Sequence, residues 1–174
     1  VGEIRDITTG GIAVKAAQTG HMVMSTLHTN DGPQTLTRLQ DMGVQSFAVA
    51  TSINLITAQR LLRRLNPDNR VEIEMPDDAL RKEDFPEEMI KAGMQLYGPG
   101  EETEDNPGYK GRAGIYQVMP ISEDLKRLII EEANAVQLAD QAAKEGVWDI
   151  RRSGLQKVAD GITSLAEVNR VTVE

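Results

Sequence analysis

Residues 19–30 read TGHMVMSTLHTN, and this stretch decides the fold that we expect. Residues 22–27 in its middle form a nearly continuous run of residues that can be buried, without the regular alternation of apolar and polar residues. Such a run is typical of a parallel strand covered on both faces, so we expect an α/β sheet here. His21 and His28, the only histidines in the chain, bracket the expected strand.

Residues 1–6 read VGEIRD and place an acid, Glu3, just after a short apolar stub. Ligands of open α/β sheets bind at the carboxyl edge of the strands. A carboxylate at that edge can hold Mg²⁺ through water or orient an attacking water, although a surface acid or a helix cap would give the same pattern. If the two segments are parallel neighbours, His28 reaches the same edge and can donate a hydrogen bond to a phosphate oxygen. His21 falls at the opposite end, which argues against a metal pair, and both imidazoles could instead be structural.

The remaining pattern predicts mostly helices. Thr8 or Thr9 caps a helix that runs to about Gln18, and a second helix follows Asp31 and stops at Gly43. Ser46 opens a longer helix that ends at Arg60, Arg63 and Arg64, where Asn66-Pro67 breaks it. We expect a strand over residues 111–119 and helices over 123–133, 135–145 and 149–160, with Ser122 and Asn134 as caps and a last capping box over 164–167.

Composition sets further limits. The chain has 174 residues, 40% of them hydrophobic, with no cysteine, which excludes disulfides and thiolate metal sites. No apolar run approaches the ~20 residues of a membrane helix. We find no signal peptide, and because Val1 is not an initiator we expect a cytosolic piece of a longer chain.

The net charge of −8 is concentrated in residues 66–108, which carry 13 acids and 4 bases. We expect this acidic segment to be a loop apart from one short helix over residues 86–94. The acidity argues against nucleic-acid binding. The arginines at 60, 63 and 64 suit phosphate or carboxylate partners, but a solvated helix end is the simpler interpretation.

The strings VGEIRD, IAVKAAQTGHMVMSTLHTND, TAQRLLRRL and GYKGRAGIYQVMPIS together resemble the type II/type IV secretion ATPase superfamily. The first two are similar to its Walker B and histidine boxes, and the resemblance covers nearly the whole chain. The later phrase and the insert before it look most like the pilus assembly branch or the general secretion branch.

The resemblance implies part of a RecA-like P-loop ATPase core with a C-terminal helical subdomain and an acidic insert. We expect residues 1–65 in the core, 66–108 as the insert, 109–120 as a strand returning to the core and 121–174 as the helical subdomain. It also implies a cytoplasmic hexamer, peripheral at the inner membrane, that hydrolyses ATP with Mg²⁺ and works with an inner-membrane platform protein and regulatory proteins.

The resemblance further implies roles for individual residues. Glu3 corresponds to the Walker B glutamate near Mg²⁺ and the attacking water, and His28 faces the γ-phosphate. Arg5 and His21 belong to the same two boxes. Arg60 and Arg63 match a basic helix that lines the nucleotide or the subunit interface.

Two features depart from the family pattern. No G-x-x-x-x-G-K-[ST] occurs in these residues, so we expect the phosphate-binding loop upstream of Val1 and little ATP binding by the chain alone. Relatives often hold zinc with two C-x-x-C pairs in the insert. The matching positions here are Asn66, Asn69, Glu101 and Glu104, which are poor zinc ligands, so no zinc is expected.

Three functions therefore stay open. The first is an ATP-driven motor subunit for type IV pilus assembly, the second is the related type II secretion ATPase, and the third is a docking module for the platform protein without chemistry of its own.

Overall fold

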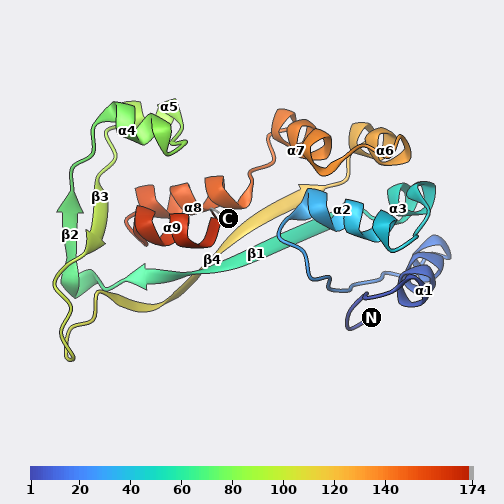
Figure 1. Ribbon diagram of the computed structural model, residues 1–174, viewed down its shortest axis with the longest axis horizontal. Coiled ribbons are helices and arrows are strands. Elements are labelled where there is room, and N and C mark those ends of the chain that lie inside the picture. The colour runs from blue at the N-terminus through green and yellow to red at the C-terminus, as the bar shows by residue number, and fades with distance from the viewer. Residues whose placement is uncertain (173–174) are drawn as a thin grey trace. The chain divides into compact units, whose positions relative to one another are not determined.

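The computed structural model describes residues 1–172 and divides into two compact units. The first unit contains residues 1–58 and 117–148, and the second contains 59–116 and 149–174, of which 173–174 lie outside the described residues. Strands β1 (Leu55–Leu65) and β4 (Tyr109–Pro120) pair in a two-stranded sheet and contribute residues to both units (Figure 1). The helices after residue 120 divide between the two units.

The first unit is mainly helical. Its helices are α1 (Ile7–Gln18), α2 (Gly32–Asp41), α3 (Ser46–Ser52), α6 (Glu123–Ile130) and α7 (Ala135–Lys144). Asp31, Ser122 and Asn134 cap α2, α6 and α7 as predicted, each accepting a hydrogen bond from a backbone N–H of the first turn. The predicted cap of α1 is wrong: Asp6, and neither threonine, accepts from the backbone N–H of Thr9 at 2.8 Å.

The core of the first unit forms where α2, α3, α6 and α7 pack on one another. Leu36, Val49, Leu125, Ile129 and Leu138 are fully enclosed there. Burial of such side chains stabilises the fold by roughly 1.5–3 kcal/mol each. Gly32 lies so close to Met119 that an added Cβ would meet its Cε at 2.8 Å, and its backbone N–H donates to buried Gln117 at 2.7 Å.

The long helix predicted from Ser46 to Arg64 is wrong. The structure has the short helix α3 followed by β1. Ile56, Ala58, Arg60 and Leu62 are more buried than their neighbours, so burial alternates with the period of a strand. Pairing with β4 decides the conformation, and no local pattern reveals such a partner.

The acidic segment is ordered, so the expected loop is also wrong. After the 3₁₀ turn η1 (Pro67–Asn69), strands β2 (Arg70–Ile73) and β3 (Leu96–Pro99) pair antiparallel, with Arg70 opposite Pro99 and Ile73 opposite Leu96. Helices α4 (Asp77–Lys82) and α5 (Glu87–Lys91) lie between them in sequence, and only α5 was predicted. Buried Leu80, Phe85 and Ile90 supply an apolar core that the acidic composition conceals.

Helices α8 (Ile150–Ala159) and α9 (Leu165–Thr172) complete the second unit and pack on each other. Arg151 of α8 is four-fifths enclosed and donates to the backbone oxygen and carboxylate of Glu83, just after α4, and to the side chain of Asn169 in α9. The insert is therefore fastened to the terminal helices.

Asn66 and Asn69 hold the end of the insert by hydrogen bonds. Nδ2 of Asn66 donates to Asn106 Oδ1 and to the Pro107 carbonyl, both at 2.9 Å. Nδ2 of Asn69 donates to the backbone oxygens of Glu101 and Asn106. Asn66 is 4% exposed, so its amide is committed to this asparagine clasp, formed by Asn66 and Asn69 with residues 100–108.

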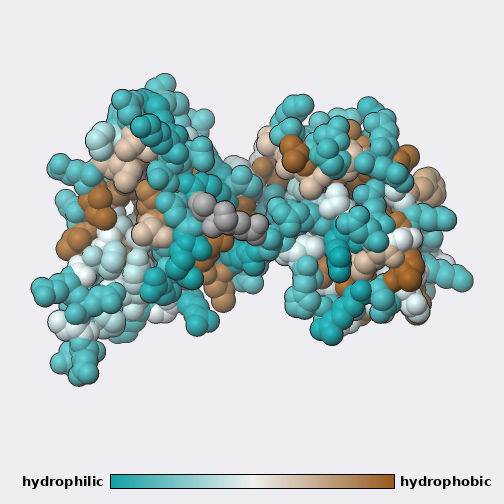
Figure 2. Space-filling view, in the orientation of Figure 1, coloured by the Kyte–Doolittle hydropathy of each residue, from teal (hydrophilic) through white to brown (hydrophobic). Residues whose placement is uncertain are grey.

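Residues 22–27 do not form the buried strand predicted for them. The structure assigns them no strand, and Met22 and Met24 are 89% and 74% exposed. The backbone carbonyls of Met24 and Thr26 accept hydrogen bonds from the backbone nitrogens of Val1 and Ile4. Figure 2 shows that each unit also has hydrophobic residues exposed at its surface.

No helix within residues 1–172 is both long and apolar enough to cross a membrane.

Candidate functional site

Two extended segments of the first unit build the candidate site. The terminal amine of Val1 donates to the Met24 carbonyl and the Ile4 N–H donates to the Thr26 carbonyl, both at 3.0 Å. The Thr26 hydroxyl also donates to the Gly2 carbonyl at 2.8 Å. The segments therefore run side by side in the same direction, and their carboxyl ends meet.

Glu3 and His28 come together at that end, as predicted. His28 Nε2 lies 2.8 Å from Glu3 Oε1. Arg5 Nη2 lies 2.5 Å from the other carboxylate oxygen, Oε2. The Glu3 side chain is 20% exposed, whereas those of Arg5 and His28 are 73% and 86% exposed. The Glu3 carboxylate is thus mostly enclosed, whereas the Arg5 guanidinium and the His28 imidazole that contact it face solvent.

The neighbours of Glu3 keep it ionised. The hydrogen bond from Arg5 lowers the pKa of the Glu3 carboxyl, and the charges on Arg5 and His28 lower it further, against a smaller opposing effect of desolvation. The same contact raises the pKa of Arg5. A carboxylate held in the charged form can accept hydrogen bonds from water or attract a cation.

The free acceptor of this carboxylate fits a hydrated magnesium ion. Glu3 Oε1 is buried and, within the described residues, accepts no hydrogen bond, since the His28 contact is an ion-pair contact without hydrogen-bond geometry. Within residues 1–172 no group of three or more acidic or histidine side chains is arranged so that it could hold a metal ion by itself. One carboxylate is sufficient for Mg²⁺ that keeps its waters and binds substrate phosphates, so the residues present fit that ion.

His21 lies apart from this pair, also as predicted. Its Nδ1 lies 3.1 Å from the Thr19 hydroxyl, and its backbone N–H donates to Ala16 at the end of α1. These contacts support a structural role at the helix end.

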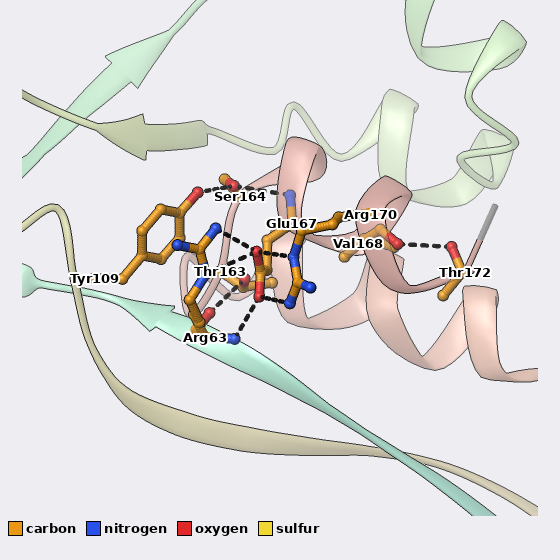
Figure 3. Close-up of polar contacts among 8 residues, drawn as sticks. All are labelled: Arg63, Tyr109, Thr163, Ser164, Glu167, Val168, Arg170 and Thr172. Atoms are coloured by element: carbon orange, nitrogen blue, oxygen red, sulfur yellow. Dashed lines mark hydrogen bonds and ion pairs between the residues drawn. The ribbon is translucent and has the colours of Figure 1, made fainter. Parts of the chain in front are cut away.

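Arg60 and Arg63 belong to β1 in the second unit, on a strand and not on the basic helix that the resemblance implied. Arg63 contacts Glu167 of α9. Its Nε and Nη2 donate to Oε2 at 3.0 and 2.8 Å, and its backbone N–H donates to Oε1 at 2.9 Å. Arg170 grips the same carboxylate with Nε and Nη2 at 2.9 and 2.7 Å (Figure 3).

Glu167 is completely buried and carries a pKa lowered to about 2. Desolvation would raise the pKa, but the hydrogen bonds from Arg170 and Arg63 outweigh it. The Arg63 guanidinium also stacks 4.2 Å above the centre of the Tyr109 ring, and the Tyr109 hydroxyl lies 2.6 Å from the Ser164 hydroxyl.

Sequence reasoning missed this cluster, which we call the Glu167 cluster: Arg63, Glu167 and Arg170. The sequence suggested Glu167 only as part of a capping box, and its backbone N–H does donate to the capping oxygen, Ser164 Oγ, at 3.2 Å. The i,i+3 spacing of Glu167 and Arg170 was a local signal of a helical ion pair. Its link to Arg63 has no local signal, because 104 residues separate them.

Comparison with known proteins places the chain in a family. A sequence model of the type II/IV secretion system protein family matches residues 1–170. The chain is 56% identical to the type IV pilus assembly ATPase PilB of Pseudomonas aeruginosa over 99% of its own length and 30% of that protein. It is 42% identical to the type II secretion system ATPase E of Vibrio cholerae over its whole length and 34% of that protein.

Solved structures show the same fold. The pilus retraction motor PilT with bound ADP matches all of this chain and 39% of its own with a TM-score of 0.67 at 19% identity. The ATPase DotB of Legionella pneumophila matches 98% of this chain and 37% of its own with a TM-score of 0.63 at 18% identity. The α/β fold class is confirmed, and the chain spans about a third of the length of its curated relatives. The chain belongs to the type II/IV secretion system protein family.

Proposed function

We propose that this chain is part of a cytoplasmic, hexameric ATPase subunit that powers type IV pilus assembly at the inner membrane together with a platform protein. The observation that carries the proposal is the 2.8 Å contact between His28 and the Glu3 carboxylate at the meeting ends of two parallel segments. The 56% identity to a pilus assembly ATPase favours pilus assembly over secretion. The 42% identity to a secretion ATPase makes type II secretion the second candidate.

The proposal assigns a task to each residue of the site. His28 covers Oε1 of Glu3 in this structure; once His28 turns to the γ-phosphate, Oε1 can accept a hydrogen bond from water and orient that water for attack. Arg5 holds the carboxylate in place through Oε2. His28, exposed above it, donates to the γ-phosphate. Mg²⁺, when bound, would neutralise part of the charge on the phosphates.

The wider assignment rests on the resemblance. We propose that residues 1–65 belong to a RecA-like core, 66–108 to an insert, 109–120 to a strand returning to that core and 121–174 to a helical subdomain. We propose that His21 and Arg60 contribute to nucleotide binding or to the subunit interface. The phosphate-binding loop belongs to another part of the protein, so residues 1–174 alone should bind Mg·ATP weakly and not hydrolyse it.

The proposal includes no zinc in the insert. Its support is the asparagine clasp: the side chains at two of the four cysteine positions of relatives already make hydrogen bonds to residues 100–108. Elemental analysis that finds stoichiometric zinc would contradict it.

Hydrolysis by the full-length subunit tests the catalytic assignment. Glu3→Gln should slow single-turnover hydrolysis by at least about 100-fold, because the amide cannot accept the proton of an attacking water as a carboxylate does, while ATP affinity changes little. His28→Gln should slow it less, since glutamine still donates a hydrogen bond. Glu131→Gln, an exposed carboxylate of the same unit, is the matched control.

Full hydrolysis by the Glu3 variant would refute the assignment. A variant that loses binding to the platform protein but still hydrolyses ATP would favour the docking module.

A further inference from the structure

A pocket of about 460 Å³ opens beside the Glu167 cluster in the second unit. Its lining residues are Leu61, Leu62, Arg63, Arg112 and Arg170. Leu62 is fully buried and Leu61 is 48% exposed, so the lining combines one exposed leucine with three arginines. The proposed catalytic site of Glu3 and His28 shares no residue with this pocket.

The cluster leaves the pocket positively charged. The three arginines carry three positive charges, and Glu167 neutralises one of them. Arg112 is exposed, and its side chain makes no hydrogen bond or ion pair in the part of the chain that the structure describes. A surplus of two positive charges on one concave surface attracts a multiply charged anion.

The arginines also keep donors for such an anion. Arg63 and Arg170 each point Nε and Nη2 at Glu167 (Figure 3), and within residues 1–172 no hydrogen bond is made by either Nη1 group. Their side chains are 50% and 56% exposed, so these amino groups can reach a ligand. Glu167 therefore acts as a rigid support that orients two guanidinium forks without using all their donors.

The acceptor capacity of Glu167 is filled, which directs the remaining donors outward. Its two oxygens receive five hydrogen bonds, from Arg63, Arg170 and the Arg63 backbone. A second carboxylate would neutralise only one of the two surplus charges and would fill little of the volume. A pair of linked phosphoryl groups supplies more charge and more acceptor oxygens in a shape that guanidinium forks match.

We propose that this pocket binds a diphosphate group, with Arg112 as the principal free donor, Arg63 and Arg170 as pre-oriented donors and Leu61 available to the remainder of the ligand. This site goes beyond the proposed ATPase function and does not depend on it, because its residues are not those of the proposed catalytic site.

Titration of the 174-residue chain with inorganic pyrophosphate at constant ionic strength tests the proposal. Two-dimensional NMR would follow the side-chain Nε–Hε signals of arginine and the backbone signals of residues 61–63. We expect saturable shifts at Arg112, Arg63 and Arg170, and Arg112→Gln should weaken binding about tenfold, the loss expected for one charge-assisted contact. Arg112 is chosen because replacing Arg63 or Arg170 would leave Glu167 buried with fewer partners.

The matched control is Arg64→Gln, which removes the same charge from the next position of β1, outside the pocket lining. It should change the affinity less than twofold. Titration with adenosine diphosphate in a second arm shows whether a nucleoside adds affinity through Leu61, and equal affinities would indicate that the phosphoryl groups alone are recognised.

Three results would overturn the proposal. Shifts that never saturate, or equal weakening by Arg64→Gln and Arg112→Gln, would indicate general charge attraction. Equal affinity for succinate, a dicarboxylate, would exclude recognition of phosphoryl groups. None of these readouts involves ATP hydrolysis, so failure here leaves the proposed function standing.

Discussion

Glu167→Gln removes the carboxylate that Arg63 and Arg170 share, and the cost can be calculated from the structure. The pKa of Glu167 is about 2 in the folded protein against an ordinary value of 4.5. At 1.36 kcal/mol for each pKa unit, the ionised carboxylate stabilises the folded state by about 3 kcal/mol at pH 7. The Glu167 side chain is completely enclosed, but those of Arg63 and Arg170 are 50% and 56% exposed, so solvent screening makes this figure an upper value.

The sign of the pH dependence follows from the lowered pKa. The stabilisation is fully present above pH 4.5 and is lost as the pH falls from 4.5 toward 2. About 2 of the ~3 kcal/mol should be gone at pH 3. The Glu167→Gln variant has no carboxyl to titrate there, so the stability difference between the two proteins should shrink by that amount.

Urea unfolding followed by NMR signals of the second unit measures this difference at pH 7 and at pH 3. Glu72→Gln, which removes an exposed carboxylate of β2, is the control and should alter the free energy of unfolding by less than about 0.5 kcal/mol. Parallel pH profiles for the original chain and the Glu167 variant would refute the reasoning, since they would show that Glu167 contributes no titrating stability.

Three further substitutions test the packing. Asn66→Ala should cost about 2 kcal/mol, because it leaves the Pro107 carbonyl without its donor, and hydrogen exchange of residues 100–108 should speed up; unchanged exchange would contradict the clasp. Arg151→Met should cost about 2–3 kcal/mol by releasing Glu83, measured by urea unfolding, and a neutral result would show that the insert is held otherwise. Gly32→Val should lower the melting temperature through overpacking against Met119, and an unchanged melting curve would mean that the contact relaxes freely.

Local signals explain which parts of the fold could be predicted. Ser122 and Asn134 cap α6 and α7 through hydrogen bonds that span three residues, so the sequence alone reveals them. The proximity of Glu3 and His28 was predictable because an acid and an imidazole each follow an apolar segment, and parallel segments align such ends.

Features that depend on distant partners could not be predicted in the same way. Leu61 and Leu62 together with three arginines suit a helix and a strand alike, and pairing with β4 selects the strand. Glu167 is a charged residue in the first turn of α9, and its burial is explained only by its contact with Arg63 of β1. The acidic insert contains four buried apolar residues among its carboxylates, Leu80, Phe85, Ile90 and Leu96, so its composition alone resembles that of a loop.

The most direct test of the account is a structure of the full-length subunit with Mg²⁺ and a non-hydrolysable ATP analogue. We expect the Glu3 carboxylate within one water molecule of the metal and His28 Nε2 within about 3 Å of a γ-phosphate oxygen. A γ-phosphate bound away from both residues, with the contact between Glu3 and His28 undisturbed, would contradict the assignment of this pair to ATP hydrolysis.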